Sequence, residues 1–217
     1  SRDATGYSCS FGYIFDYSTS SYKENSYFDG DFAPGYGYKT GSTSYGSPYY
    51  YSFSVPSLLK TVTITDANQI GKGAFHECTD ISKIVLNDGI TSIGDYAFYN
   101  CAIKDFSIPN TVETIGKYAF YDCSSLQEMF IPNSVTSIEP YTFCGCYGIN
   151  KLAISENVTS IGDHAFSGCS GIDNLIIPNQ TERIGSYAFS NCKGLKKINI
   201  TDSVTTMGKG AFSSGYG

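Results

Sequence analysis

The most regular feature of the chain is a phenylalanine that returns at a nearly constant interval. The row consists of Phe75, Phe98, Phe120, Phe143, Phe166, Phe189 and Phe212, and successive members are 22 or 23 residues apart. A cysteine follows each of the first six by three residues, and an isoleucine or methionine precedes each of the seven by five. Self-similarity at a period of about 20–50 residues is typical of repeat architectures. The spacing therefore predicts seven stacked units.

Each unit also contains a short stretch in which apolar residues alternate with others. These stretches are Val62–Ile64, Ile84–Leu86, Phe106–Ile108, Met129–Ile131, Leu152–Ile154, Leu175–Ile177 and Ile198–Ile200. A period of two predicts a β-strand with one face in the core. Stacked units would pair these strands into a parallel sheet with a spacing of about 4.8 Å. The later part of each unit is too short for a long helix, and we expect one helical turn or a 3₁₀ turn there.

Six of the eight cysteines form a row of their own. They are Cys78, Cys101, Cys123, Cys146, Cys169 and Cys192. Side chains stacked in register are parallel and about 4.8 Å apart, which exceeds the Cβ separation of about 3.5–4.5 Å in a disulfide. We therefore expect a row of reduced thiols that pack as small apolar groups. Cys9 and Cys144 lie outside the row and are the alternative candidates for a disulfide.

Two units carry the repeat motif most fully, as in Phe-Ser-Ile-Pro-Asn-Thr-Val-Glu-Thr-Ile-Gly-Lys-Tyr-Ala-Phe-Tyr-Asp-Cys over Phe106–Cys123 and Met-Phe-Ile-Pro-Asn-Ser-Val-Thr-Ser-Ile over Met129–Ile138. Over about residues 57–217 the chain resembles the BspA-type leucine-rich repeats of bacterial and protist surface proteins. The resemblance implies a curved leucine-rich-repeat solenoid, usually part of a larger secreted or surface-attached protein. It also implies, for some members, adhesion to host matrix proteins or to other cells.

Three positions depart from the repeat motif. Glu139 stands where glycine is usual, Thr142 replaces an alanine, and Thr181 falls in a row of valine and isoleucine. We expect local irregularity around units four and six at these positions, within an unchanged fold.

Residues 1–56 differ in composition, because they are rich in Tyr, Ser and Gly. Alternating aromatic residues predict one strand in Phe11–Tyr17 and another in Tyr49–Val55, with a Gly/Ser-rich loop between them. We expect an ordered insertion that packs on the solenoid of residues 57–217. Low-complexity disorder is the alternative.

Composition narrows the functions that are compatible with this chain. The net charge is −6 and no block of Lys or Arg occurs, which argues against nucleic acid or an anionic membrane as a partner. No apolar run approaches the roughly 18 residues of a membrane span. His76 and His164 occupy different repeat positions, four units apart, and no phosphate-binding glycine motif or nucleophile elbow is present. We therefore expect no enzymatic activity, no cofactor and no metal site, Cys144-Gly-Cys146 included.

The outward face of the predicted sheet is the candidate binding surface. Residues that alternate with core positions point to the opposite side of a sheet. Three of them are apolar where solvent is expected, and charges of both signs flank them, as on many protein-binding faces. The hypothetical ligand-binding residues are Val85, Phe130, Ile176, Lys83, Glu128 and Lys151. The alternative is that these are ordinary exposed hydrophobic residues, or that a neighbouring element covers them.

Together these features predict a non-enzymatic binding module, secreted or at the cell surface, that recognises a matrix protein or another surface protein. Carbohydrate binding on exposed aromatic rings is a second possibility. Its candidate platform is Tyr36, Tyr38, Tyr45, Tyr49 and Tyr50. A third is a rigid spacer in a larger surface protein. The last unit has Gly215 in place of the row cysteine and no evident polar cap, so we expect this end to be frayed or covered by another molecule.

Overall fold

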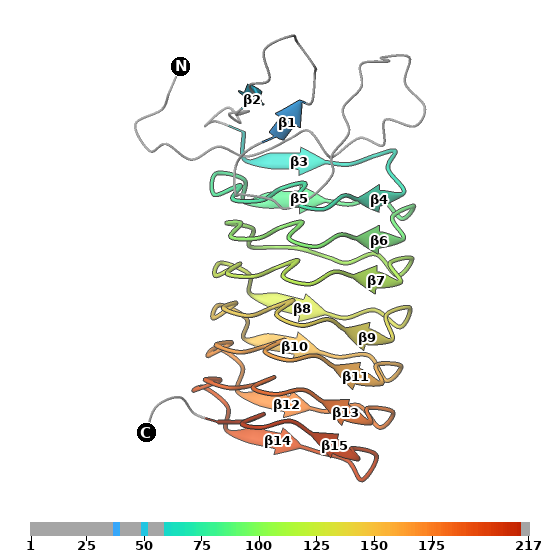
Figure 1. The fold of residues 1–217 in the computed structure, drawn as a ribbon, viewed down its shortest axis with the longest axis vertical. Coiled ribbons are helices and arrows are strands. Elements are labelled where there is room, and N and C mark those ends of the chain that lie inside the picture. Colours follow the sequence, from blue (N-terminus) through green and yellow to red (C-terminus); the bar gives the residue numbers. More distant parts are fainter. Residues whose placement is uncertain (1–36, 40–48, 52–58, 214–217) are drawn as a thin grey trace.

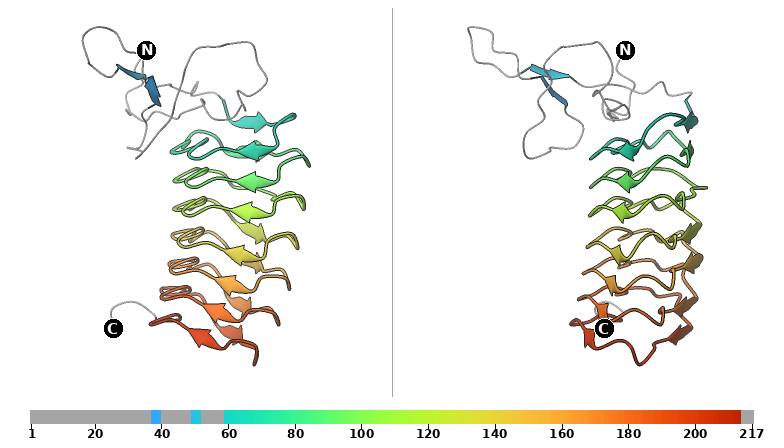
Figure 2. Two further views of the ribbon diagram at one scale, coloured as in Figure 1. Left: turned by 45° about the vertical axis from the view of Figure 1, so that its right-hand side comes forward. Right: turned by 90° about the vertical axis from the view of Figure 1, so that its right-hand side faces the viewer.

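The computed structural model describes residues 37–39, 49–51 and 59–213. The described repeats stack into a single column, with the earliest unit at one end and the last at the other (Figure 1). Every unit contributes extended segments to two sides of this column, and turns join them (Figure 2). Equivalent residues of neighbouring units pair in parallel, as Ile161 does with Ile184. The predicted solenoid with units of about 23 residues is therefore confirmed.

The longer strands form what we call the first sheet. They are β3 (Thr61–Thr63), β5 (Lys83–Val85), β8 (Glu128–Phe130), β10 (Lys151–Ala153), β12 (Asn174–Ile176) and β14 (Lys197–Asn199). Parallel, in-register ladders join β3 to β5, β8 to β10, and β12 to β14. Ile84 and Met129, in the middle of their strands, are buried while both neighbours are exposed. The predicted alternation is thus confirmed in these strands, which lie one residue earlier than predicted. It is absent from the terminal strand β14, where all three residues are exposed, and the strand predicted at Phe106–Ile108 does not form.

Shorter strands form a second sheet that we did not predict. They are β4 (Gln69–Ile70), β6 (Ser92–Ile93), β7 (Thr114–Ile115), β9 (Ser137–Ile138), β11 (Ser160–Ile161), β13 (Arg183–Ile184) and β15 (Thr206–Met207). Two ladders make up this sheet, β4-β6-β7 and β9-β11-β13-β15. A strand of two residues shows no alternation, so only the isoleucine or, in β15, the methionine of each strand was visible as a row in the sequence.

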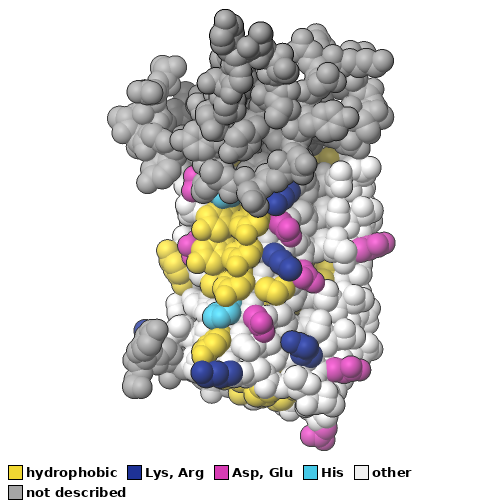
Figure 3. Space-filling view, in the orientation of Figure 1, with side chains coloured by type: hydrophobic (Ala, Val, Ile, Leu, Met, Phe, Trp, Pro, Cys, Tyr) yellow, Lys and Arg dark blue, Asp and Glu magenta, His cyan; other side chains and the backbone are white. Residues whose placement is uncertain are grey.

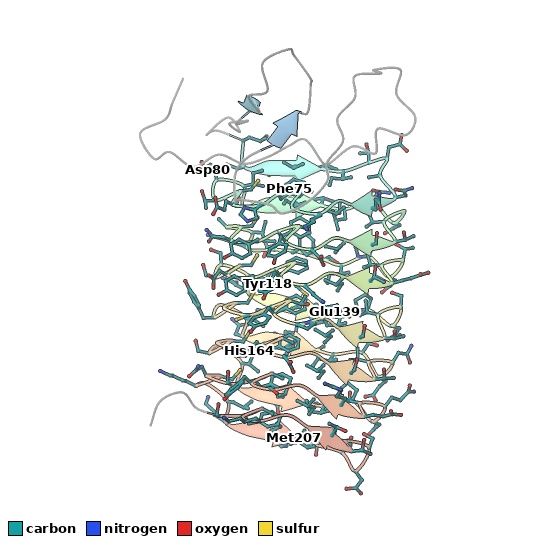
Figure 4. The ribbon with its side chains drawn as sticks, viewed as in Figure 1. Phe75, Asp80, Tyr118, Glu139, His164 and Met207 are labelled. Atoms are coloured by element: carbon teal, nitrogen blue, oxygen red, sulfur yellow. The ribbon has the colours of Figure 1, made fainter. Side chains whose placement is uncertain are left out.

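The glycine that follows every short strand except β9 permits the close approach of neighbouring units. A Cβ on Gly162 would lie 2.6 Å from the backbone nitrogen of Pro140, and one on Gly185 would lie 2.5 Å from that of Asp163. Glu139 occupies this position in unit four, and there the second sheet is interrupted, because β7 and β9 do not pair. The predicted irregularity at Glu139, labelled in Figure 4, is therefore confirmed.

The other two departures from the motif are accommodated by hydrogen bonds. Thr142 is fully buried, and its hydroxyl donates to the Glu139 carbonyl oxygen at 2.8 Å. Thr181 is also fully buried and donates to the Val158 carbonyl oxygen at 2.7 Å. Both neighbours of β13 pair with it, so the second sheet is regular in unit six. Our expectation of irregularity at Thr181 is wrong, because its hydroxyl has a partner in the preceding unit.

In the turn region of each unit, backbone N–H groups alternate between two kinds of acceptor. The N–H groups of Ala74 and His76 donate to carbonyl oxygens three residues earlier, as in a 3₁₀ turn. The N–H group of Phe75, between them, donates instead to Ala97 O in the next unit, at 2.7 Å. The predicted 3₁₀ turn is thus a series of separate turns, because every second backbone N–H group donates to a carbonyl oxygen of the neighbouring unit.

The phenylalanine row is the centre of the core, as predicted. The six members from Phe75 to Phe189 are at most 1% exposed, and their rings stack on one another. Ring centroids of neighbours lie between 5.0 Å, for Phe98 and Phe120, and 5.4 Å, for Phe189 and Phe212. Phe106, from the third unit, adds edge contacts to the rings of Phe98 and Phe120.

Five of the six cysteines in the row are buried free thiols, as predicted. They are Cys101, Cys123, Cys146, Cys169 and Cys192. Each Sγ donates to a phenylalanine carbonyl oxygen of the preceding unit, at 2.9 Å from Cys123 to Phe98. Burial raises the pKa of the Cys123 thiol to about 12. The thiols therefore link neighbouring units as well as filling space.

Cys78, the first member of the row, is disulfide-bonded. The prediction of a fully reduced row is wrong at this residue, because the in-register argument compared only cysteines within the row. The alternative disulfide between Cys9 and Cys144 is also wrong, since Cys144 is a free thiol.

A short hairpin precedes the column in the sequence. Its strands, β1 (Gly37–Lys39) and β2 (Tyr49–Tyr51), pair in an antiparallel manner. The strand β2 lies within the predicted Tyr49–Val55 stretch, whereas β1 was not predicted. The other predicted strand, in Phe11–Tyr17, lies outside the described residues, and the ordered insertion over residues 1–56 stays a prediction.

Candidate functional site

The outer face of the first sheet carries the residues predicted to bind a ligand. Exposed fractions are 39% for Val85, 46% for Phe130 and 57% for Ile176, on strands β5, β8 and β12. These side chains occupy the same repeat position, so they lie in one line along the column. The predicted outward orientation is confirmed, while the binding role remains a hypothesis that these observations motivate.

The charged residues beside this apolar line form one local cluster on β8 and β10. Lys151 Nζ lies 3.4 Å from Glu128 Oε2 and 4.9 Å from the centre of the Phe130 ring. Both charged groups are more than half exposed, so their ion pair adds little to stability. The stacked ammonium and ring instead present a fixed surface of mixed chemistry, which suits recognition.

The first sheet is interrupted where the third unit should contribute a strand. Only one bridge, between Lys83 and Asp105, connects this unit to β5, and no ladder joins it to β8. The segment Cys101–Ile103 is one residue shorter than its equivalents, which accounts for the 22-residue spacing. The missing residue changes how the third unit enters the sheet.

A notch of about 390 Å³ lies at this interruption. Its apolar lining includes Val85 from β5, Phe130 from β8 and the buried Phe106 between them. Val85 and Phe130 were predicted from the sequence as ligand-binding residues, but the notch was not predicted. The 22-residue spacing was the signal that could have located it.

A second candidate surface lies over the turn region, where aromatic rings stack along the column. One row consists of Tyr96, Tyr118, Tyr141, His164 and Tyr187, with centroid separations of 4.6–5.1 Å. A parallel row consists of His76, Tyr99 and Tyr121. Figure 3 shows the resulting apolar patch between the two histidines. Because the rings stack face to face, neighbouring rings occupy one another's faces, which makes a poor platform for stacking a sugar ring.

The first aromatic row has an unusual backbone conformation. Tyr118 has a φ of 58° and His164 a φ of 56°, in the left-handed region that favours glycine. Glycine does occupy this position at the two ends of the row, as Gly73 and Gly210. Stacking with both neighbours offsets the backbone cost, and burial raises the pKa of the Tyr118 hydroxyl.

The aromatic platform predicted in the N-terminal segment cannot be assembled from the described residues. Tyr38 lies in β1, and Tyr49 and Tyr50 lie in β2, whereas Tyr36 and Tyr45 are outside the described residues. Within the described residues, His76 and His164 belong to different aromatic rows, and no cluster of metal-ligating side chains occurs. The described part of the chain also has no helix with the length and apolar character of a membrane span.

The last unit leaves apolar residues uncovered in the described structure. Ile198 is 36% exposed, Ile200 39% and Met207, labelled in Figure 4, 48%. Both β14 and β15 nevertheless pair regularly with the preceding unit. As far as Ser213 this regular pairing counts against the predicted fraying, while coverage by another molecule stays a prediction. Gly215 lies outside the described residues.

Comparisons with known proteins agree with this architecture. The sequence pattern of the BspA type Leucine rich repeat region matches residues 47–172 and 91–216, in six copies. A leucine-rich repeat protein from T. pallidum has a similar fold, with a TM-score of 0.69 and 23% identity, over 73% of this chain and 77% of that one. No curated protein matches the sequence.

Two further solved structures are leucine-rich repeat proteins from Bacteroides ovatus and Eubacterium ventriosum. The first is 28% identical with a TM-score of 0.52, over 86% of this chain and 45% of that one. The second is 26% identical with a TM-score of 0.62, over 77% and 47%. This chain thus matches less than half the length of either protein. With its repeats and parallel sheets, the chain belongs to the BspA-type leucine-rich repeat proteins.

Proposed function

We propose that this chain is a non-enzymatic binding module, exposed outside the cell, that recognises a protein partner through the outer face of the first sheet. The observation that carries the proposal is the line of exposed apolar residues, Val85, Phe130 and Ile176, beside charges of both signs. Apolar anchors within a polar surround are typical of protein-binding surfaces. A rigid repeat column holds such residues at fixed spacing.

Two observations support an extracellular location. Cys78 is disulfide-bonded, and disulfides persist in oxidising compartments. The chain also belongs to the BspA-type leucine-rich repeat family, and the resemblance of its repeats to those of surface proteins implies secretion or surface attachment. An adhesin-like role toward matrix proteins follows as the specific form of the proposal.

A binding assay with matched surface variants tests the proposal. Immobilised chain is exposed to fibronectin, laminin and collagen, and the same assay is run with Phe130→Asp and Thr136→Asp. Thr136 is exposed beside β9 in the second sheet, so its variant introduces the same charge on another face. We expect Phe130→Asp to reduce binding about tenfold or more, and Thr136→Asp to leave it unchanged. Equal effects of the two variants on every ligand would refute the sheet face as the site.

Carbohydrate binding through the Tyr-rich segment is the alternative function. A glycan array with the full chain tests it, because glycan signals that survive Phe130→Asp would place recognition away from the first sheet.

A further inference from the structure

Backbone bonding in the first sheet is interrupted at the notch, as it also is between β10 and β12. Where the sheet is regular, a strand-end N–H group donates to the next unit, as Ile64 does to Val85 O at 2.8 Å and Ile131 to Ala153 O at 2.9 Å. The equivalent donors beside the notch, Leu86 and Ile108, have no such backbone bond among the described residues. Beyond the Lys83–Asp105 bridge, the strand-end backbone on either side of Ser107 is therefore not bonded to the next unit.

The shape of the notch follows from side-chain size at one repeat position. Val85, Ser107 and Phe130 are equivalent residues of consecutive units, and Ser107 is the smallest of the three. Phe106 is 7% exposed and closes the inner side. The result is a depression with apolar walls, open to solvent, and its volume of about 390 Å³ is enough for a large side chain.

Charged groups of both signs form the rim of the notch. Lining residues are Lys83 and Lys104 against Asp88, Asp105 and Glu128. Among these five, only Glu128 takes part in an ion pair within the described residues, with Lys151. The whole chain carries a net charge of −6, which adds a negative field around the site. Because Lys83 and Lys104 balance Asp88 and Asp105 at the rim, it is the net charge of the whole chain that favours a ligand with a positive charge close to its apolar group.

We propose that the notch seats one aromatic or large aliphatic side chain from an extended, basic segment of the protein partner. This inference rests on the proposed function and names the feature that the sheet face recognises. The anchor side chain lies between Val85 and Phe130, and an adjacent Lys or Arg lies toward Asp105 and Asp88. A buried anchor in a pocket with a polar rim is the usual centre of a protein interface.

Peptide titration followed by NMR tests the notch directly. The probes are Ac-Phe-Arg-NH2, Ac-Phe-Glu-NH2 and Ac-Gly-Arg-NH2, added to the full chain, with methyl β-glucoside as a carbohydrate probe. We expect Ac-Phe-Arg-NH2 to bind most tightly, with amide shifts centred on Val85, Ser107 and Phe130, and to weaken as salt is raised. Equal binding of the Glu and Arg peptides, or equally strong shifts with the glucoside, would overturn the basic-peptide assignment.

Two matched variants locate the binding of the peptide. Ser107→Phe fills the notch, whereas Ala153→Phe adds the same ring at the equivalent exposed position of β10, outside it. We expect Ser107→Phe to weaken Ac-Phe-Arg-NH2 at least about tenfold, and Ala153→Phe to change it less than about twofold. Ser107→Val serves as a smaller filling variant, and unchanged circular dichroism confirms that each variant folds. Binding that survives both Ser107 variants would overturn the proposal.

The same variants separate this inference from the proposed function. If Phe130→Asp abolishes capture of a matrix protein while Ser107→Phe does not, the sheet face is the site and the notch is not its anchor. If neither variant affects capture, the proposed function fails together with the inference.

Discussion

Replacement of Gly185 by alanine tests the close approach of neighbouring units in the second sheet. Gly185 follows β13, and its N–H group donates to Ile161 O at 2.8 Å. An added Cβ would lie 2.5 Å from the backbone nitrogen of Asp163 and 2.6 Å from the carbonyl carbon of Gly162. Gly185 is not in the left-handed region of φ, so the cost is steric. Backbone atoms of a paired unit cannot move away without loss of the ladder.

The magnitude follows from two opposing effects. Alanine in place of glycine restricts the unfolded chain, which alone would stabilise the protein by about 0.4–1 kcal/mol. Overpacking against a fixed neighbour costs about 1–3 kcal/mol, to which loss of the Gly185 hydrogen bond adds about 1 kcal/mol. We expect a net destabilisation of about 2 kcal/mol, and a fall in Tm of about 4–8 °C for a chain of this size. Differential scanning calorimetry measures this directly.

The chain supplies its own control for this experiment. Glu139 occupies the same repeat position in unit four, where a side chain is already present and β7 and β9 are unpaired. Glu139→Ala should therefore change the free energy of unfolding by less than about 0.5 kcal/mol. A Tm for Gly185→Ala at or above that of the native chain, or equal losses for both variants, would refute the steric explanation of the glycine row.

Three further predictions concern the thiols and the tyrosine row. Cys123→Ala removes the donor to Phe98 O and leaves a small cavity, so urea unfolding should show a free energy of unfolding that is lower by about 2–3 kcal/mol. Cys123→Ser should recover part of this loss. An unchanged urea midpoint would contradict the role of the thiol as a donor. Burial raises the pKa of Cys123 and Cys192 to about 12, so between about pH 9 and 12 the unfolded chain binds fewer protons than the folded one. Stability should therefore fall as pH rises through this range, and a Tm that stays constant from pH 8 to 11 would disprove it. Tyr118→Gly and Tyr118→Ala both lose the stacking with Tyr96 and Tyr141. Because glycine tolerates the φ of 58°, the Gly variant should be more stable than the Ala variant by about 1 kcal/mol. The reverse order in thermal melts would count against backbone strain at this residue.

The repeat made the core predictable from the sequence. Once Phe98 and Phe120 are recognised as equivalent residues of stacked units, their contact follows from the stacking itself. The same argument placed Val85 and Phe130 on the outer face, because alternation in a strand fixes the direction of each side chain. Prediction succeeded wherever a residue's position depends only on its equivalents in neighbouring units.

The features that prediction missed depend on something other than equivalence. The second sheet consists of two-residue strands, which carry no periodicity, although the recurring glycine at Gly162 and Gly185 was a usable sign of close backbone approach. The notch depends on one absent residue between Cys101 and Ile103, whose effect on strand pairing cannot be derived from the spacing alone. The disulfide of Cys78 involves a partner outside the row, so the geometry of the row did not apply to it.

Both sheets lose their ladders at the same level of the column, between the third and fourth units. Across that level the backbone bonds that persist are chiefly on the turn side, such as Phe120 N–H to Thr142 O at 2.8 Å. The column therefore consists of two blocks, units one to three and units four to seven, that are joined mainly along the turn side. A shear or tensile load, of the kind an anchored adhesive molecule bears in flow, would bend the array at this level first, next to the notch, and would change the width of the notch before either block deforms.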